Sequence, residues 1–262
     1  MTHFMDDKSV STSSSALIDN NAGAYKILPG GAAFCSGVIP YEGYEIVRVL
    51  LRPWIPLEQG YGFIENYLKD IGRPIQAFCG IELRVPAPLA MNDWSSFNVP
   101  YLAQLRKWGL IFGDQSGVCR SNIALALHPP ATTSVCAFTY TAPTLAKSKT
   151  FFLSGQADID ASGKAIADGD TGPTAMQRRA RYTIDTVGAT LAKLDVSWQD
   201  TTQIALFHSH DIPDLWEPKL LGALGEALSR GVLVYRARPP IAGLEVELEA
   251  RAVRQEIIVA TS

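Results

Sequence analysis

The sequence predicts an α+β fold of two units, each a mixed sheet with two helices packed on one face. Two observations support this prediction. Apolar residues recur at helical spacing in both halves of the chain, and segments typical of strands flank these helices in the same order. The 262 residues, 47% hydrophobic and 19% charged, are enough to form a substantial core.

The clearest helix is expected over residues 174–194. Asp170 and Thr171 can cap its first turn, where the missing N–H of Pro173 costs nothing. Its apolar residues recur at intervals of three and four, as one face of a helix requires. They are Met176, Ala180, Ile184, Val187, Leu191 and Leu194.

Strands and a second helix complete this unit. Residues 149–156 are predicted as a strand before the helix, and residues 201–208 alternate as a strand after it. Pro218 is expected to open the second helix, whose apolar face consists of Leu220, Leu221, Leu224 and Leu228. Residues 232–236 and 244–253 are expected as two closing strands, joined by a turn rich in proline and glycine.

The first half of the chain repeats this order. Its first helix has an apolar face spaced 4, 3, 4 and 3 and ends at Gly72; the face consists of Leu57, Tyr61, Ile64, Leu68 and Ile71. The predicted order is strand, helix, strand, helix and two strands, over residues 44–51, 57–71, 74–85, 99–108, 121–127 and 134–140. A tandem duplication is the simplest architecture that explains the repeat.

The predicted organisation is a flexible tail over residues 1–22, followed by domains over residues 23–145 and 146–262. The tail is rich in serine and lacks the apolar core of a signal peptide. Residues 142–149 are the expected linker.

Composition excludes several classes of function. With 23 Lys+Arg against 26 Asp+Glu, the net charge of −3 gives no electrostatic reason to bind nucleic acid or an anionic membrane. The sequence has no apolar run of the ~18 residues that a membrane span needs. No CxxC pair occurs among Cys35, Cys79, Cys119 and Cys136, so buried, reduced thiols in a cytoplasmic protein are expected.

Residues 149–254 resemble the RidA (YjgF-type) family of enamine/imine deaminases. Residues 152–156, Phe-Leu-Ser-Gly-Gln, are similar to the family's strand that ends in Ser-Gly-Gln. Residues 230–234, Arg-Gly-Val-Leu-Val, are similar to the strand that its substrate-binding arginine opens, and residues 247–253 to its closing Glu-Ile-Glu-Ala strand. The resemblance implies a tandem of RidA-like domains with the chorismate-mutase-like fold.

The first half resembles the family more faintly. Arg120 opens a segment similar to the arginine strand, but residues 134–138 lack the glutamates of the closing strand. Cys35-Ser36-Gly37 is the candidate remnant of the Ser-Gly-Gln segment. A two-domain deaminase of 2-aminomuconate-type ring-cleavage products is the kind of member that this pattern resembles.

The resemblance implies a hydrolytic deaminase that converts an enamine or imine carboxylate into a 2-oxo acid and ammonia. It implies that Arg230 and Glu247 are catalytic and that Arg120, Ser154 and Gly155 bind substrate. A planar arginine suits the carboxylate, a glutamate can deprotonate water, and backbone N–H groups can approach closely at a glycine. This chemistry requires no metal or organic cofactor. The family also implies a homotrimer, with sites between adjacent subunits.

Each of these residues has an ordinary structural alternative. Arg230 follows the predicted helix and could complement its C-terminus. Glu245, Glu247 and Glu249 alternate along one strand and could form an acidic stripe on an exposed face. Ser154-Gly155 could be a plain strand bend.

His208, His210 and Asp211 suggest a metal site, because alternate strand positions place both imidazoles on one face. No further ligand with supporting spacing occurs, so we expect these residues to be structural, with no metal. Two other functions stay open: a non-catalytic ligand-binding or regulatory protein, and a relative that hydrolyses an enol ether of the chorismate type. Release of ammonia from an enamine would argue against the first, and release of an oxo acid without ammonia would favour the second.

Overall fold

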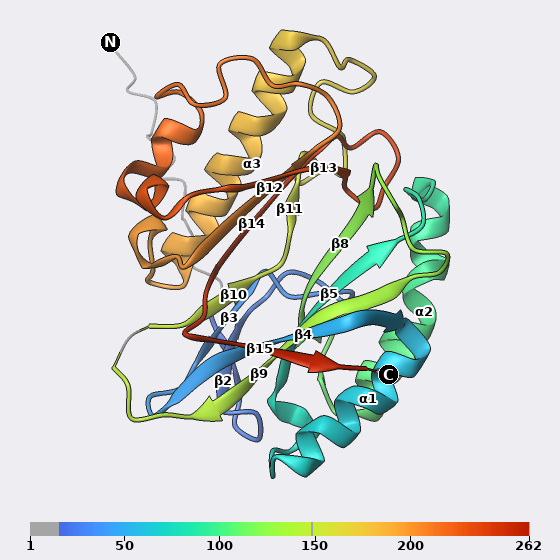
Figure 1. Cartoon of the computed structure of the whole chain (residues 1–262), viewed down its shortest axis with the longest axis vertical. Coiled ribbons are helices and arrows are strands. Elements are labelled where there is room, and N and C mark those ends of the chain that lie inside the picture. The colour runs from blue at the N-terminus through green and yellow to red at the C-terminus, as the bar shows by residue number, and fades with distance from the viewer. Residues whose placement is uncertain (1–15, 148, 262) are drawn as a thin grey trace, which may run out of the picture.

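The computed structural model describes residues 16–147 and 149–261, whose main feature is a 13-stranded mixed sheet (Figure 1). Its strands are β1 (Ile18–Asn20), β2 (Tyr25–Leu28), β3 (Gly37–Pro40), β4 (Tyr44–Pro56), β5 (Phe78–Val85), β8 (Cys119–Leu125), β9 (Ser134–Pro143), β10 (Phe151–Leu153), β11 (Gln156–Ala157), β12 (Gln203–His208), β13 (Leu233–Arg238), β14 (Val246–Ala252) and β15 (Gln255–Ala260). The short strands β6 (Ile111–Phe112) and β7 (Gln115–Ser116) pair separately. The predicted α+β class with a mixed sheet is confirmed.

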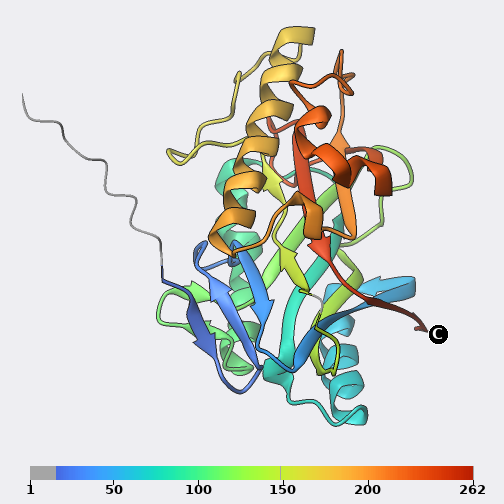
Figure 2. The same ribbon diagram turned by 90° about the vertical axis from the view of Figure 1, so that its left-hand side faces the viewer.

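In the described parts of the chain, three α-helices and three 3₁₀ segments accompany the strands. The α-helices are α1 (Leu57–Asp70), α2 (Met91–Lys107) and α3 (Pro173–Lys193), and the 3₁₀ segments are η1 (Ile75–Ala77), η2 (Trp198–Asp200) and η3 (Leu221–Arg230). Helices α1 and α2 cover the sheet of the first half, and α3 covers that of the second (Figures 1 and 2). Within the described residues, no helix combines the length and the apolar composition that a membrane span requires.

The two halves repeat one sheet topology. In the first half the strand order is β4-β9-β5-β8, and in the second it is β10-β14-β12-β13. In each set the first two neighbouring pairs are antiparallel and the third is parallel. Each of these four strands therefore has a topological counterpart in the other half.

The sheets of the two halves are joined by a short pairing between β13 and β8, which we call the seam, and each sheet also gains an edge strand from the other half. At the seam, β13 pairs with β8 through Ala237 with Leu125 and Arg238 with Ala124. Strand β3 of the first half covers the outer edge of β10, and the C-terminal β15 runs parallel to β4. Strands β1–β3 and β15 were not expected. The predicted tail lies outside the described residues up to position 15, and the expectation of flexibility does not hold for Ile18–Asn20, which pair with β2.

The predicted apolar face of α3 is buried against the sheet. All six of its predicted residues belong to the core of the second half: Met176, Ala180, Ile184, Val187, Leu191 and Leu194. The second helix expected after Pro218 is instead the 3₁₀ segment η3, broken at Gly225, whose φ of 58° and ψ of −134° are not helical. Glycine adopts such angles readily, so it interrupts the helical backbone while Leu221 and Leu224 stay buried.

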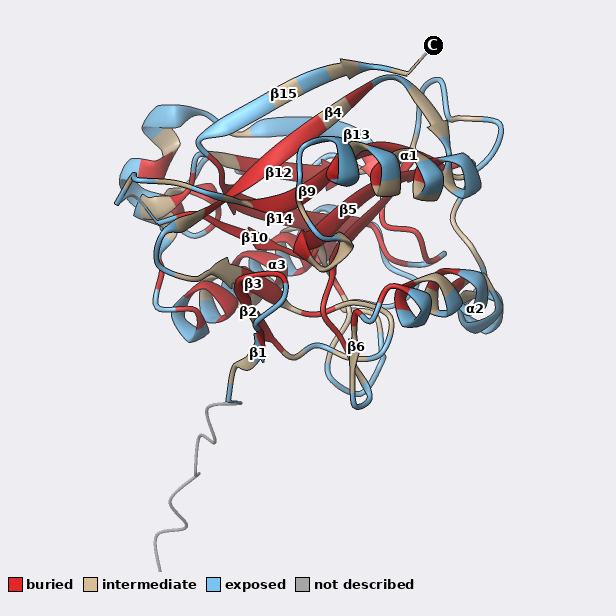
Figure 3. Ribbon diagram, turned by 90° about the horizontal axis from the view of Figure 1, so that it is seen from below, coloured by how far each residue is buried: buried red, intermediate tan, exposed pale blue. Residues whose placement is uncertain are grey.

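The sheet faces that point away from the helices carry buried charges that connect the two halves. Glu82 lies between Ile81 and Leu83, which pack on the helix side, so its own side chain points to the opposite face. Arg48 Nε and Nη2 donate to the two oxygens of Glu82 at 2.6 and 2.7 Å. Arg251, on β14 of the second half, contacts Glu82 at 3.4 Å. Figure 3 shows how thoroughly the central strands are buried.

Two arginines hold the Glu82 carboxylate in its charged form. Burial acts to raise the pKa of Glu82, but the charges of Arg251 and Arg48 outweigh burial and hold that pKa well below its ordinary value. A depressed pKa in the folded state contributes stability that is present above the unfolded value and is lost as the pH falls. The network is therefore an acid-sensitive link between the halves.

We expect Glu82→Gln to lower the free energy of unfolding by about 3–5 kcal/mol at pH 7, because two buried guanidinium groups lose their common counter-charge. Denaturant titration monitored by circular dichroism would measure it. The matched control is Glu256→Gln, because Glu256 pairs with the same Arg48 at 2.8 Å but its side chain is 43% exposed. That change should cost less than about 1 kcal/mol. Equal losses in the two variants would show that the buried ion pairs of Glu82 contribute no more to the free energy of unfolding than the exposed pair of Glu256.

Candidate active site

A pocket of about 310 Å³ lies where the two halves meet. Arg120 and Asn122 of β8 contribute to it from the first half. From the second half, the pocket is lined by Gly155, which lies between β10 and β11, and by Glu247 of β14. The pocket therefore requires both halves of the chain.

Arg120 is a buried cation whose terminal nitrogens are free. The residue is 4% exposed, and neither Nη1 nor Nη2 has a hydrogen-bond partner within the described residues. Its guanidinium carbon lies 5.4 Å from the ring centre of Phe34, 5.0 Å from that of Trp94 and 4.8 Å from that of Tyr101. Burial lowers the pKa of Arg120, yet an arginine remains protonated in proteins. Three rings partly stabilise the charge and leave its donors available to an anion.

The Ser154-Gly155 turn positions Arg120. The backbone N–H of Arg120 donates to Ser154 Oγ at 2.9 Å, and Ser154 Oγ donates to the carbonyl oxygen of Cys35 at 2.5 Å. The N–H of Gly155 donates to the carbonyl oxygen of Arg120 at 3.2 Å, and that of Ser154 to Ser36. Both N–H groups that we expected to bind substrate are thus occupied within the protein. The turn instead fixes the strand that bears Arg120.

Glu247 presents a buried carboxyl group to the same pocket. The residue is 3% exposed, and its carboxyl oxygens take part in none of the hydrogen bonds found among the described side chains. Burial raises the pKa of Glu247 well above its ordinary value, and the negative charge of Glu249 raises it further. A raised pKa keeps a carboxyl group protonated to a higher pH than usual, which suits a group that first donates and then accepts a proton.

Gly155 makes room for this carboxyl group. A Cβ atom at position 155 would lie 1.8 Å from Glu247 Oε1. Any larger residue at this position therefore displaces the carboxyl group. The glycine of the Ser-Gly turn is required by close approach to Glu247.

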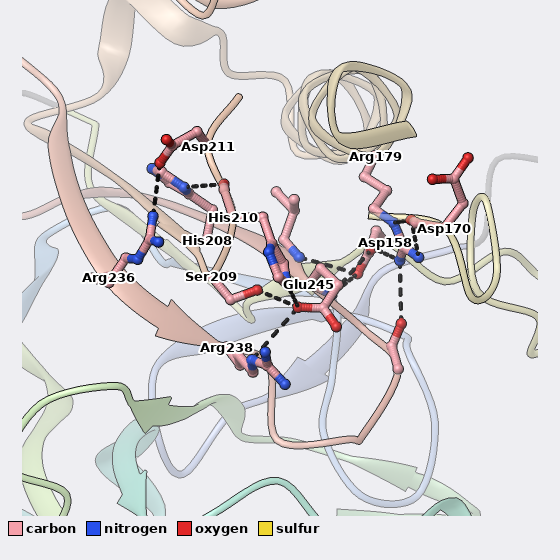
Figure 4. A network of polar contacts seen from close by, with 12 residues as sticks. Asp158, Asp170, Arg179, His208, Ser209, His210, Asp211, Arg236, Arg238 and Glu245 are labelled. Carbon is pink, nitrogen blue, oxygen red and sulfur yellow. Dashed lines mark hydrogen bonds and ion pairs between the residues drawn. The ribbon is translucent and has the colours of Figure 1, made fainter. Parts of the chain in front are cut away.

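A second buried pair fixes the segment that leads into β14 (Figure 4). Asp158 pairs with Arg179 of α3 and accepts the backbone N–H of Glu245 at 3.1 Å and of Val246 at 3.3 Å. Arg179 also donates to the carbonyl oxygen of Gly243 at 3.2 Å. Helix α3 thereby holds the start of the strand that carries Glu247.

Arg230, expected to be catalytic, is not brought to this pocket. Its Nη2 donates to the carbonyl oxygen of Gln199 at 2.7 Å, and it lines a separate cleft. The reason lies in the strand register. The residue of β13 level with Glu247 across β12 is Tyr235, five positions after Arg230. Arg230 thus lies toward the other end of the sheet and donates to carbonyl groups of η2. This contact is similar to the structural alternative considered above, in which Arg230 complements the C-terminus of a helix.

The histidine cluster is arranged as a structural network (Figure 4). His208 Nδ1 is 2.8 Å from the carbonyl oxygen of His210, and Asp211 pairs with Arg236 at 2.9 Å. Strand β12 ends at His208, so the alternation that would place both imidazoles on one face does not continue. Across residues 16–147 and 149–261, no group of three or more His, Cys, Asp or Glu side chains is placed to hold a metal.

Sequence reasoning missed two features of the pocket. Asn122 is 3% exposed, and neither its Nδ2 nor its Oδ1 has a partner among the described residues. The sequence could have indicated Asn122, because alternate residues of a strand point to the same face and Asn122 follows Arg120 by two positions. Trp94 lies in the first turn of α2, which begins eight residues before the expected helix. No periodic pattern identified that turn.

The chain matches a known family over most of its length. The model of the family described as "2-aminomuconate deaminase CnbZ" matches residues 17–257. The chain belongs to this family. A relative from Comamonas testosteroni, named 2-amino-5-chloromuconate deaminase, is 31% identical over 245 residues, which are 90% of this chain and 96% of that protein. The chain is a deaminase, a hydrolase that acts on C–N bonds.

Solved structures show more distant similarity. A chorismatase is 11% identical with a TM-score of 0.44, and the match covers 90% of this chain and 78% of that one. The YjgF gene product of E. coli is 22% identical with a TM-score of 0.26, over 40% of this chain and 81% of that one. YyfB of Yersinia pestis, from the Rid protein family, is 14% identical with a TM-score of 0.31, over 43% and 83%.

We expect Gly155→Ala to fold but to lose about 100-fold in kcat/KM, because the added methyl group displaces the Glu247 carboxyl group from its reacting position. Steady-state kinetics on an enamine substrate would measure the loss. Gly62→Ala is the control, since a Cβ there meets nothing within 4 Å and the residue lies on the exposed side of α1. Wild-type activity in folded Gly155→Ala would refute the assigned role of this glycine.

Proposed function

We propose that the chain deaminates a 2-aminomuconate-type enamine dicarboxylate to the 2-oxo dicarboxylate and ammonia, with Arg120 and Glu247 in contact with the substrate. One observation carries the proposal: a buried guanidinium with free donors and a buried carboxyl group with a raised pKa face the same pocket. The family and the named relative support the substrate class. A pocket of about 310 Å³ suits a small six-carbon acid.

Arg120 suits the carboxylate next to the reacting carbon. The planar guanidinium can donate two parallel hydrogen bonds to the two carboxylate oxygens, which fixes the plane of the substrate. The aromatic rings around it exclude water, so the pairing is stronger than it would be at the surface.

Glu247 suits the proton transfers. As the protonated acid it donates a proton to a carbon of the enamine, which becomes an iminium ion. As the resulting carboxylate it accepts a proton from the water that attacks C2, and a carbinolamine forms. That proton then passes to the nitrogen, the C–N bond breaks, and ammonia leaves as the C2 hydroxyl becomes a carbonyl group, with its proton returning to Glu247. Glu247 ends protonated, and each step uses only water and groups of this chain.

The direct test of the proposal is ammonia release. Purified protein would be mixed with freshly generated 2-aminomuconate, and ammonia and the 2-oxo product would be measured together. We expect equal amounts of both. Tight binding of the substrate without ammonia would instead support a non-catalytic ligand-binding protein.

We expect Arg120→Lys to lose about 2–4 kcal/mol of transition-state stabilisation, because an ammonium group cannot reproduce the bidentate contact. The ratio of kcat/KM between wild type and variant measures this loss. Arg230→Lys is the matched control and should stay within about threefold of wild type, since Arg230 lies outside the pocket. A large loss in Arg230→Lys would place Arg230 at a pocket formed between copies of the chain.

We expect Glu247→Gln to bind the 2-oxo product, to lose the chemical step and to be more stable than wild type above about pH 4.3. Glu247 has a raised pKa when folded, so wild type loses stability as the pH rises from the unfolded pKa to the folded one. The amide does not titrate and avoids this loss. Thermal unfolding at pH 4 and at pH 8 would show a gap that widens at the higher pH. An equal gap at both values would contradict the raised pKa.

The homotrimer implied by the RidA resemblance stays a prediction. The large apolar residues Leu233, Val234 and Tyr235 are exposed along β13. These side chains give such an assembly an apolar surface to bury.

A further inference from the structure

Asn122 is a buried amide that the fold leaves without partners. It lines the pocket, is 3% exposed, and both its donor and its acceptor are unpaired within the described residues. A buried polar group without a partner costs about 1–3 kcal/mol. The side chain projects from the same face of β8 as Arg120, about 7 Å further along the strand.

Among the described residues, the other buried asparagines have at least one paired side-chain atom: both atoms of Asn20 are paired, whereas Asn98 has a paired Nδ2 and an unpaired Oδ1. Asn20 Nδ2 donates to the carbonyl oxygen of Gln76 at 3.0 Å, and its Oδ1 accepts the N–H of Gly23 at 2.9 Å. Asn98 Nδ2 donates to the carbonyl oxygen of Trp94 at 2.8 Å. Asn122 differs from both because it lines the pocket and neither of its polar atoms has a partner among the described residues, so a ligand in the pocket would supply the missing partners.

We propose that Asn122 recognises the nitrogen-bearing carbon of the substrate: its Oδ1 accepts an N–H of the C2 amino group, and its Nδ2 donates to the oxygen that water adds at C2. The inference rests on the proposed function, which places the C1 carboxylate on Arg120. One donor and one acceptor side by side match the amino and hydroxyl groups that the carbinolamine carries on one carbon. Exchange of the amide oxygen and nitrogen does not alter this match.

The distal carboxylate of the substrate is a poorer partner. A carboxylate is only an acceptor, so it would satisfy Nδ2 and leave the buried Oδ1 facing a negative charge. The carbinolamine, which carries an N–H group and an oxygen on the same carbon, supplies a partner to both atoms of the amide. Asn122 is therefore a residue that distinguishes a 2-amino or 2-oxo acid from the same acid without a substituent at C2.

The test compares two ligands and two variants by calorimetry. The ligands are muconate, which has no C2 substituent, and the 2-oxo dicarboxylate product, which retains the C2 oxygen. We expect Asn122→Leu to bind muconate as wild type does and to bind the 2-oxo acid about tenfold more weakly, because one hydrogen bond is lost. The control Asn98→Leu changes the same atoms outside the pocket lining and should leave the ratio of the two affinities unchanged.

Stability and kinetics complete the test. Because leucine removes an unpaired buried amide, Asn122→Leu should unfold at the same temperature as wild type or a higher one, whereas a structural role would lower that temperature. On the enamine substrate, the variant should lose mainly kcat, with KM changed less. Equal weakening of both ligands would assign Asn122 to the distal carboxylate and overturn the inference. Absence of ammonia release by wild type, with the C2 discrimination intact, would refute the proposed function and leave the assignment of Asn122 standing.

Discussion

Arg120 carries a positive charge into the interior and meets no carboxylate among the described residues. Three other buried arginines, Arg48, Arg179 and Arg251, each pair with an acid. Arg84 is also buried without an ion pair among the described residues, but it donates to the carbonyl oxygen of Leu83 at 2.9 Å, whereas both terminal nitrogens of Arg120 lack a partner. An unpaired buried charge is among the most costly features a protein can contain. Aromatic rings on the guanidinium partly stabilise this charge. A carboxylate from outside would remove this cost, which supports the proposal that Arg120 binds a carboxylate of the substrate.

The duplicated topology explains why the pocket forms at the seam between the halves. Arg120 lies on β8 and Glu247 on β14, and the sheet order places the β8 of one unit beside the β13 of the other. In topological terms β13 is the counterpart of β8, but Arg120 lies within β8, whereas Arg230 lies in η3, before β13 begins at Leu233. The counterpart of β14 is β9, whose sequence contains no acid. Arg230 therefore has no glutamate from the first half to face, and the described chain forms one complete pair.

Much of this arrangement could be predicted from sequence, and the failures have physical causes. The face of α3 was predictable because burial against a sheet imposes a helical period. Arg120 and Glu247 were identified by a resemblance of local segments. The choice between Arg120 and Arg230 could not be made locally, because it depends on which sheet edges meet. The edge strand β15 was missed because its partner β4 lies some two hundred residues earlier in the chain. Gly225 broke a helix that the leucine pattern alone predicted.

One of the charges in the network that joins the halves also acts on the pKa of Glu247. Glu249 contacts Arg251 at 3.3 Å and accepts a hydrogen bond from the Ser121 hydroxyl, so its negative charge is stabilised although it is buried. That fixed charge lies two residues from Glu247 on the same face of β14, and after burial it is the main cause of the raised pKa of Glu247. Arg251 in turn contacts Glu82, which Arg48 binds from the first half. The ion pairs that join the two units therefore include the carboxylate whose charge, after burial, contributes most to raising the pKa of Glu247.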